Sequence, residues 1–137
     1  MGPGSKVLDV GCGKAFLLHE MKLIEPDLII YGFDISQYAL EKNLDTTKPH
    51  VYCQKAQDKY KYKDKEIDLV ISLHVLHSLR LFDFEKAINE INRVSKQSYI
   101  VLESYRNENE LVNLQCWATV CECFFDVDEW IYLFKKF

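Results

Sequence analysis

The sequence predicts a doubly wound α/β fold, in which a mainly parallel sheet of about five strands is flanked by helices. Two observations carry this prediction. Apolar runs rich in Val, Ile and Leu alternate with helical periodicity from Lys6 to Ser104, an order typical of parallel strands joined by right-handed crossovers. The first run, residues 6–10, leads directly into Gly11 and Gly13, where the backbone can turn sharply and a ligand can approach closely.

The composition fits one globular domain. A chain of 137 residues, 48% of them hydrophobic, is long enough for one core, so we expect residues 1–137 to form a single domain. The net charge of −4 and the lack of a basic helix face argue against nucleic acid as a partner. No apolar run reaches the roughly 20 residues of a membrane helix, and the N-terminus has no signal-peptide pattern, so a cytoplasmic protein without membrane contact is expected.

The five cysteines are expected to be reduced thiols. Their number is odd and no secretory signal precedes them. Three of them cluster in the sequence, but Cys121 and Cys123 are too close together for the usual spacing of zinc ligands. We therefore expect no metal site.

The helix after the glycine turn is predicted by Leu17, Met21 and Ile24, which recur at the i, i+4, i+7 spacing of one helical face. Pro26 ends this pattern. The N-terminus of the helix would point at a ligand above the glycines.

The second strand, residues 28–34, ends in Asp34, which lies 21 residues after Gly13. At this distance an acidic residue on a second strand meets a ribose, and its carboxylate can accept hydrogen bonds from both hydroxyls. Alternatively, Asp34 or Ser36 only caps the next helix. The nearby glycines favour ribose binding.

The middle of the chain continues the alternation. A short helix over 37–43 and a weaker strand over 50–54 come first. Residues 59–66, in which Lys and Tyr alternate, are most simply a solvated loop. A strongly apolar strand over 67–74 follows.

The last third contains a helix, a strand and a second helix. A helix that starts at Asp83 has a clear apolar face, and a fifth strand covers 99–104. Asp126 and Glu129 have the spacing of a capping box for a final helix. For residues 107–125 both a helix and an extended chain stay open. The two apolar helix faces consist of Phe84, Ala87, Ile88, Ile91 and Val94, and of Trp130, Ile131, Leu133, Phe134 and Phe137.

The residues around the glycine turn separate two classes of ligand. A dinucleotide fingerprint G-x-G-x-x-G that starts at Gly11 needs glycine where Phe16 stands. Asp9 belongs instead to the pattern D-x-G-x-G-x-G, in which Ala15 takes the place of the third glycine. With Asp9, Gly11 and Gly13 in place, and with the later motifs in the same order, the chain resembles the class I S-adenosylmethionine-dependent methyltransferases, in particular small bacterial ones.

This resemblance implies a Rossmann-like fold, S-adenosylmethionine as cofactor and S-adenosylhomocysteine as product. Asp9 would orient the methionine amino group, the two glycines would admit the methionine chain, and Asp34 would hold the ribose. At the adenine end the family often has an acidic residue, whose place Asp58, the Gln57 amide or backbone groups could take. The expected cofactor contacts are Asp9, Gly11, Cys12, Gly13, Asp34, Ile35, Ala56, Gln57, Ser72 and Leu73.

The candidate catalytic residues follow the fourth and fifth strands. His74 and His77 are each either a packed ring beside the cofactor or a base for a substrate proton. Glu103, Tyr105 and Arg106 come after the fifth strand, and Arg106 could clamp a phosphate or carboxylate on a small-molecule substrate. The implied reaction is attack of an acceptor O, N, S or C atom on the sulfonium methyl, with the protein supplying alignment.

Two other functions stay open. A domain of this fold could bind the cofactor without catalysis, because Ala15 and Lys55 depart from the family pattern. A nicotinamide-dependent oxidoreductase is a further alternative, against which Phe16 and Asp9 count.

The family fold has parts that this sequence lacks, namely a helix before the first strand and a C-terminal hairpin of two strands. We therefore expect a domain incomplete at both ends, with the fifth strand as an exposed edge. Exposed edges and apolar patches tend to find partners, so we expect self-association through Tyr99 or the segment 117–137.

Overall fold

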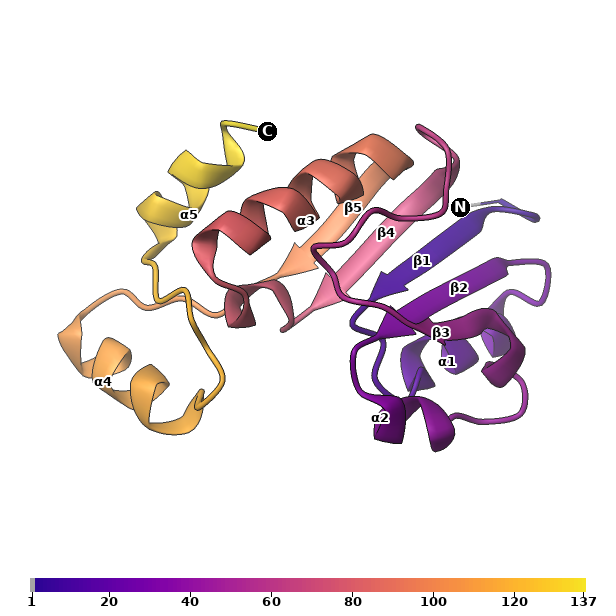
Figure 1. Cartoon of the computed structure of the whole chain (residues 1–137), viewed down its shortest axis with the longest axis horizontal. Coiled ribbons are helices and arrows are strands. Elements are labelled where there is room, and N and C mark those ends of the chain that lie inside the picture. The colour runs from indigo at the N-terminus through magenta and orange to yellow at the C-terminus, as the bar shows by residue number, and fades with distance from the viewer. Residues whose placement is uncertain (1) are drawn as a thin grey trace.

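The computed structural model describes residues 2–137 and confirms the doubly wound α/β fold (Figure 1). One five-stranded sheet has the order β3-β2-β1-β4-β5, and every neighbouring pair of strands is parallel. The order reverses beside β1, which creates the crevice where such sheets bind ligands. The strands are β1 (Lys6–Val10), β2 (Ile29–Asp34), β3 (Val51–Cys53), β4 (Ile67–Leu73) and β5 (Ser95–Val101).

Helices lie on both faces of the sheet. In Figure 1, α3 lies in front of β5, while α1, whose core lies on the other face of the sheet, is seen below β2. None of the helices among residues 2–137 has the length and apolarity that crossing a membrane requires. The helices are α1 (Phe16–Ile24), α2 (Gln37–Glu41), α3 (Leu81–Val94), α4 (Glu108–Trp117) and α5 (Val127–Phe134), with short 3₁₀ turns η1 (Lys48–His50) and η2 (Leu76–Ser78).

The central strand β1 is buried on both faces, as its apolar sequence predicts. Leu8 and Val10 belong to the core that α3 and α5 cover, and Val7 belongs to the core on the α1 side. The apolar face predicted for α3 is confirmed, because all five of its residues are buried. These two cores fix β1, and with it the glycine turn that follows.

The apolar face predicted for α1 is confirmed for Met21, which packs against the core, and is wrong for Leu17 and Ile24. Leu18 is the fully buried residue of α1, whereas Leu17 is partly exposed and Ile24 is 83% exposed. The reason lies in β2, where Gly32 leaves room for Leu18: a Cβ on Gly32 would lie 2.9 Å from the Leu18 Cδ1 atom. The glycine of β2 therefore decides which face of α1 meets the sheet.

The fifth strand begins earlier than the sequence predicts. It starts at Ser95, directly after α3, and it ends at Val101, so Glu103 and Ser104 follow the strand. Ser95 is a buried polar residue, and Lys96, Gln97 and Ser98 are exposed polar residues, so none of the four gives an apolar signal. Among the described residues β5 has β4 as its one strand neighbour, and the Tyr99 side chain is exposed.

The loop over residues 59–66 is only partly solvated. Tyr60 is 2% exposed and Tyr62 is also buried, because both rings pack onto the sheet near Phe33 and Tyr31. The loop is tied to α3 by hydrogen bonds from the Tyr60 amide to Glu90 and from Arg93 to the loop carbonyls. The alternation of Lys and Tyr thus separates solvent-facing from core-facing side chains.

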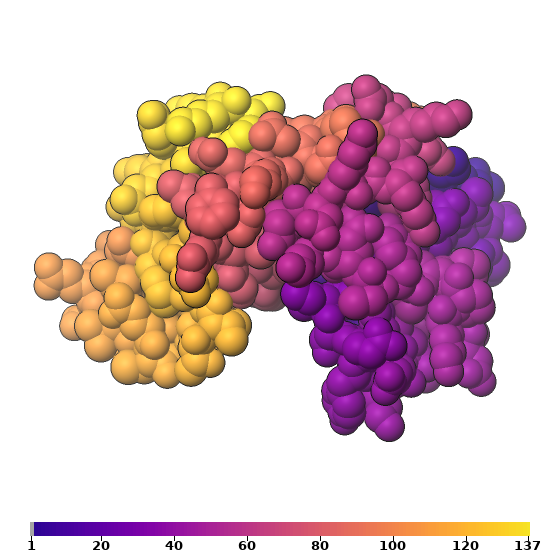
Figure 2. Space-filling model, viewed as in Figure 1, coloured from indigo at the N-terminus to yellow at the C-terminus, as the bar shows by residue number. Residues whose placement is uncertain are grey.

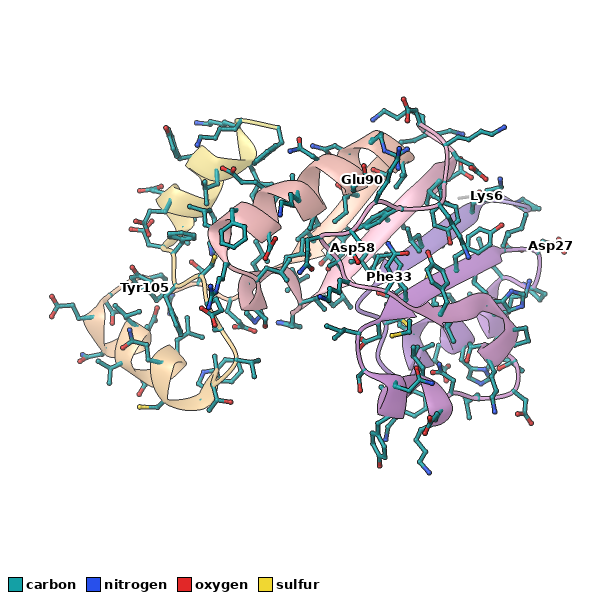
Figure 3. All side chains as sticks on the ribbon, viewed as in Figure 1. Lys6, Asp27, Phe33, Asp58, Glu90 and Tyr105 are labelled. Carbon is teal, nitrogen blue, oxygen red and sulfur yellow. The ribbon has the colours of Figure 1, made fainter. Side chains whose placement is uncertain are left out.

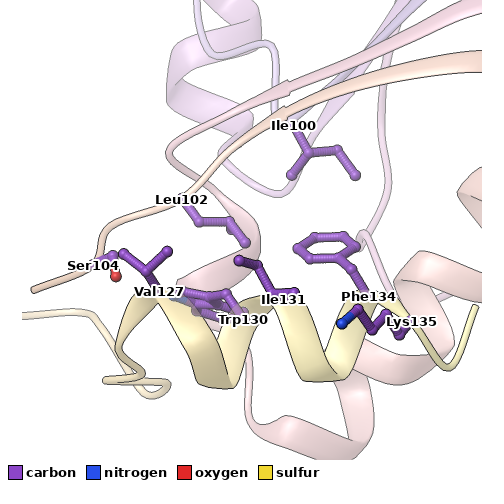
Figure 4. Close-up of a pocket in the computed structure, with 8 residues that line it drawn as sticks. All are labelled: Ile100, Leu102, Ser104, Val127, Trp130, Ile131, Phe134 and Lys135. Atoms are coloured by element: carbon purple, nitrogen blue, oxygen red, sulfur yellow. The ribbon is translucent and has the colours of Figure 1, made fainter.

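The C-terminal segment packs against the sheet edge. The predicted capping box of Asp126 and Glu129 is present at α5, and α4 lies within the stretch left open by the sequence. The α4 region forms a lobe at one end of the molecule in Figure 2. An apolar groove of about 430 Å³ runs between α5 and β5 (Figure 4) and is lined by Ile100, Leu102, Ser104, Val127, Trp130, Ile131, Phe134 and Lys135.

Candidate functional site

A pocket of about 340 Å³, the glycine-loop pocket, lies where β1 and β2 end. Its position at the carboxyl ends of the strands is the usual ligand site of doubly wound sheets, and its volume suits a small molecule. Five of the ten predicted cofactor contacts line it. The lining consists of Gly11, Phe33, Asp34, Ile35, Gln54, Lys55, Ala56, Gln57, Val75, Ser78 and Leu79.

The turn between β1 and α1 is held against β2. The amides of Gly11 and Cys12 both donate to the Phe33 carbonyl, at 2.9 and 3.0 Å. Gly11 and Gly13 have φ angles of +79° and +53°, and Ala15 also adopts the left-handed conformation, with φ +53°. The third position of the pattern therefore needs a left-handed residue, and this backbone requirement explains why glycine suits it.

The two glycines have different roles. A Cβ on Gly11 would lie 2.3 Å from the Val75 Cγ2 atom, so that glycine makes room for a neighbouring side chain. A Cβ on Gly13 would meet nothing within 4 Å. Gly13 thus faces open space, although it is not one of the residues that line the pocket. The sequence did not predict that Val75 contacts the glycine turn, because this contact forms only when β4 pairs with β1.

Asp34 connects β2 to the glycine turn. Its Oδ2 atom accepts a hydrogen bond from the Gly13 amide and its Oδ1 atom accepts one from the Ser36 amide, both at 2.8 Å. The Ser36 hydroxyl in turn caps α2 by accepting from the Ala39 amide. The side-chain cap of α2 is thus Ser36, whereas Asp34 fixes the glycine turn and lines the pocket.

Asp9 lies in β1 and Cys12 lies in the turn itself, and neither residue lines the pocket. Asp9 is 5% exposed, and its pKa is raised to about 7 by burial and, secondarily, by the negative charge of Asp34. Burial also raises the pKa of the Cys12 thiol to about 12. Near pH 7 Asp9 is consequently poised between its two states, while Cys12 stays a neutral thiol.

The wall opposite the glycine turn comes from the loop after β3. Ala56 and Gln57 line the pocket, and the buried Tyr60 hydroxyl donates to the Ala56 carbonyl at 2.8 Å. Of the two side chains predicted for the adenine end, Gln57 lines the pocket, whereas Asp58 is exposed and does not. Tyr60 is a positioning residue that the sequence did not reveal, because its neighbours are strongly charged.

Ser72 and Leu73 lie in β4 and do not line the glycine-loop pocket. The Ser72 hydroxyl is fully buried and donates to the Val10 carbonyl at 3.1 Å. This bond joins β4 to the end of β1. In the structure its role is thus to hold the two strands that carry the site.

A second pocket of about 420 Å³, the histidine pocket, shares the lining residue Ser78 with the glycine-loop pocket. It brings together three of the five predicted catalytic candidates. No group of three or more His, Cys, Asp or Glu side chains within residues 2–137 is arranged to hold a metal ion. The lining consists of His74, His77, Ser78, Glu103, Trp117, Ala118, Thr119 and Val120.

The two histidines differ in environment. His74 is exposed, has a left-handed φ of +58°, and its Nδ1 atom lies 2.6 Å from the Glu103 Oε1 atom. His77 is 5% exposed, and its buried Nδ1 atom has no hydrogen-bond partner among the described residues. Burial lowers the pKa of His77, so its ring is neutral at pH 7.

The remaining two candidates lie in a third pocket, of about 470 Å³, beside α4. Tyr105 stands far along the molecule from Phe33 of the glycine-loop pocket (Figure 3). Arg106 forms a forked ion pair with Glu110, which also accepts from its backbone amide. This pairing occupies the guanidinium that the sequence suggested as an anion clamp.

Comparison with known proteins relates the whole chain to one family. A family model described as a methyltransferase domain matches residues 2–136. The mouse arginine-hydroxylase NDUFAF5, a mitochondrial protein, is 26% identical over 115 residues, which are 84% of this chain and 33% of that protein. The chain thus spans about a third of the length of this curated relative.

Solved structures share the fold. A chain from a complex that contains the Trm112 methyltransferase activator of Haloferax volcanii superposes with a TM-score of 0.81 at 19% identity, over 99% of this chain and 62% of that one. The geranyl diphosphate C-methyltransferase of Streptomyces coelicolor, solved with S-adenosyl-L-homocysteine, gives 0.69 at 15% identity, over 90% and 50%. At these identities the likeness concerns the fold alone, and this chain covers less than two thirds of either structure.

Proposed function

We propose a function from one premise: this chain belongs to the methyltransferase domain family, whose model matches residues 2–136. We infer that it binds S-adenosylmethionine in the glycine-loop pocket and transfers the methyl group to a small-molecule acceptor. The observation that carries the proposal is the Asp34 carboxylate, which is fixed by the amides of Gly13 and Ser36 at the wall of that pocket.

The residues present suit the chemistry of this cofactor. The Asp34 oxygens are acceptors for the two hydroxyls of a ribose. Ile35, Val75 and Leu79 provide apolar contacts for a planar base, and the Gln57 amide can both donate and accept. Asp9, close to half ionised at pH 7, suits an ammonium group better than a neutral one.

When bound, S-adenosylmethionine supplies an electrophilic methyl group on a sulfonium sulfur. The protein contributes position and environment. Asp34 and the glycine turn would orient the nucleoside end, and the histidine pocket, which shares Ser78 with the glycine-loop pocket, would receive the acceptor. The volume of the histidine pocket, about 420 Å³, is in the range of small-molecule sites and supports a small-molecule acceptor.

The test compares two glycines of similar backbone conformation. Gly13 and Gly4 both have positive φ, +53° and +78°, and a Cβ on either meets nothing within 4 Å. Gly4, near the N-terminus, is remote from the pocket lining. Calorimetry should therefore show at least a tenfold loss of S-adenosylmethionine affinity in Gly13→Ala and no loss in Gly4→Ala, with both variants folded by circular dichroism.

Three outcomes discriminate the alternatives. Equal affinity of the wild type and Gly13→Ala would contradict the proposed site. Binding of NAD in place of S-adenosylmethionine would favour an oxidoreductase. Cofactor binding without transfer of a labelled methyl group to any compound of an acceptor panel would favour a binding domain or another chemistry, as the name of the mouse hydroxylase illustrates for a related protein.

A further inference from the structure

The histidine pocket contains a tryptophan that the fold leaves open. Trp117 is 62% exposed, although it lines both the histidine pocket and the third pocket. Trp130, the other tryptophan of the chain, is 5% exposed and packs against Phe84 and Phe125. An open indole buries apolar surface of a ligand, and the face of its ring also attracts cations. Trp117 therefore narrows the choice of ligand to an apolar molecule or an organic cation.

The Glu103 carboxylate distinguishes between these two classes. Glu103 lines the same two pockets as Trp117, and its carbonyl is fixed by the Trp130 indole N–H, which donates to it at 2.9 Å. Its side chain is 19% exposed and its Oε1 atom lies 2.6 Å from the His74 Nδ1 atom. Its Oε2 atom has no hydrogen-bond partner within residues 2–137. A largely enclosed carboxylate oxygen without a donor favours a ligand that brings a positive charge.

No free cation of the protein competes with such a ligand in the histidine pocket. The described residues that line it include no lysine or arginine, and burial lowers the pKa of His77, which leaves that ring neutral at pH 7. Arg106 lines the third pocket, where its guanidinium is paired with both carboxylate oxygens of Glu110. A carboxylate or phosphate would consequently lack a charged partner in the histidine pocket.

The charge of the surrounding segment has the same sign as that of Glu103. Residues 103–129 have seven acidic side chains and one basic side chain, that of Arg106. The rest of the chain has 16 basic and 14 acidic residues, so the negative charge of the protein is concentrated in this segment. Most of the segment forms the orange lobe at one end of the molecule in Figure 2. Its field would attract cations to the pocket and repel anions.

We infer that the histidine pocket binds a small organic cation, namely a substituted ammonium group that contacts the Trp117 ring and the Glu103 carboxylate. This inference rests on the proposed function in one respect: the cation is the part of the methyl acceptor that is held, not the atom that reacts. The carbon atoms of a substituted ammonium bury apolar surface while its charge meets the ring face and the carboxylate. A volume of about 420 Å³ favours a small molecule over a basic polypeptide segment.

Three probes of similar shape and different charge test the inference without turnover. Choline has a trimethylammonium group, 3,3-dimethyl-1-butanol has a neutral carbon in place of the nitrogen, and 3,3-dimethylbutanoate has a carboxylate. NMR titrations that follow the methyl protons of each probe should show choline binding about tenfold more tightly than the alcohol, a difference of about 1.4 kcal/mol. The butanoate should bind most weakly. The preference for choline should decrease as salt is added, because salt screens the charges.

Matched variants separate the contributions of the ring and the charge. Trp117→Leu removes the ring, and Glu103→Gln removes the charge at nearly constant shape. Each should lower the choline-to-alcohol affinity ratio about threefold, and the double variant should bring the ratio near one. Tyr132→Leu removes an aromatic ring that is 65% exposed outside the pocket, and Glu20→Gln removes an exposed carboxylate. Neither control should change the ratio.

Several results would overturn the inference. Wild type could bind choline and the alcohol equally, or bind the butanoate more tightly than either. The ratio could also be the same in wild type, Trp117→Leu and Glu103→Gln. A lysine-rich peptide that binds the protein when choline does not would likewise refute a small-molecule site, because the acidic lobe would then be a surface for a macromolecule.

Failure of this inference is distinguishable from failure of the proposed function. S-adenosylmethionine affinity should be unchanged in Trp117→Leu and Glu103→Gln, because neither residue lines the glycine-loop pocket. Cofactor binding without a preference for choline refutes the cation site alone. A preference for choline without cofactor binding would refute the proposed function, and with it the assignment of the cation to a methyl acceptor.

Discussion

Asp9 should destabilise the folded protein at neutral and alkaline pH. It is almost fully buried, and burial, with a smaller contribution from the charge of Asp34, raises its pKa from 3.8 to about 7. Asp9→Asn keeps the shape of the side chain and removes the ionisation. We predict that this variant is more stable than wild type at pH 8.

The magnitude and sign follow from linkage. A shift from 3.8 to about 7 corresponds to about 4 kcal/mol, because one pKa unit is worth about 1.4 kcal/mol. Below pH 3.8 the carboxyl is protonated in both states, so the stabilisation associated with the raised pKa is fully present. As the pH rises toward 7 the unfolded chain loses the proton first, and this stability is lost progressively. The variant should gain little at pH 4 and up to about 4 kcal/mol at pH 8.

Urea denaturation of both proteins from pH 4 to 8 measures this difference. Glu66, Asp68 and Glu90 have lowered pKa values, which act in the opposite direction, but they are present in both proteins and cancel in the difference. Asp27→Asn, at an exposed position at the right-hand edge of the molecule in Figure 3, is the matched control for replacing a carboxylate by an amide. A stability difference for Asp9→Asn that is constant across this range would refute the reasoning.

The same carboxyl provides a functional readout. If it faces the ammonium group of S-adenosylmethionine, the bound cofactor favours the ionised form, and binding at pH 7 should release part of a proton. Calorimetry in buffers of different ionisation enthalpy detects this release, which should vanish in Asp9→Asn. Binding without proton release in wild type would place the ammonium elsewhere.

Two further predictions concern the ribose contact and the sheet edge. Asp34→Asn retains one acceptor for the amides of Gly13 and Ser36 but loses the charge, and it should weaken S-adenosylmethionine binding at least tenfold, because one charge-assisted hydrogen bond contributes about 1.5–3 kcal/mol. A 2′-deoxy analogue should lose less in the variant, and an equal loss for both ligands would show that Asp34 does not contact the ribose. Self-association through the β5 edge or the C-terminal segment stays a prediction, since β5 has one strand neighbour among the described residues and borders the apolar groove. Sedimentation at high concentration should show oligomers that Tyr99→Lys and Ile131→Glu weaken, and a strictly monomeric wild type would contradict it.

The sequence alone determined the order of the elements and the place of the glycine-loop pocket. Buried parallel strands have near-continuous apolar sequences, and the turn chemistry of Gly11 and Gly13 is local, so both are readable without the fold. The spacing from Gly13 to Asp34 is likewise a property of one strand–helix–strand unit, and the structure joins these two residues by a hydrogen bond. The capping box of α5 was predictable because its two residues contact each other.

The tertiary structure decided which side chains are buried and which polar groups find partners, because both depend on contacts between residues distant in sequence. Gly32 of β2 selects Leu18 as the core residue of α1, and α3 draws Tyr60 out of a strongly charged loop into the core. From the sequence, His77 and Arg106 are equally plausible as residues that bind a substrate. One is enclosed with an unpaired Nδ1 atom and the other is engaged by Glu110, a difference that arises only when β4, β5 and α4 come together.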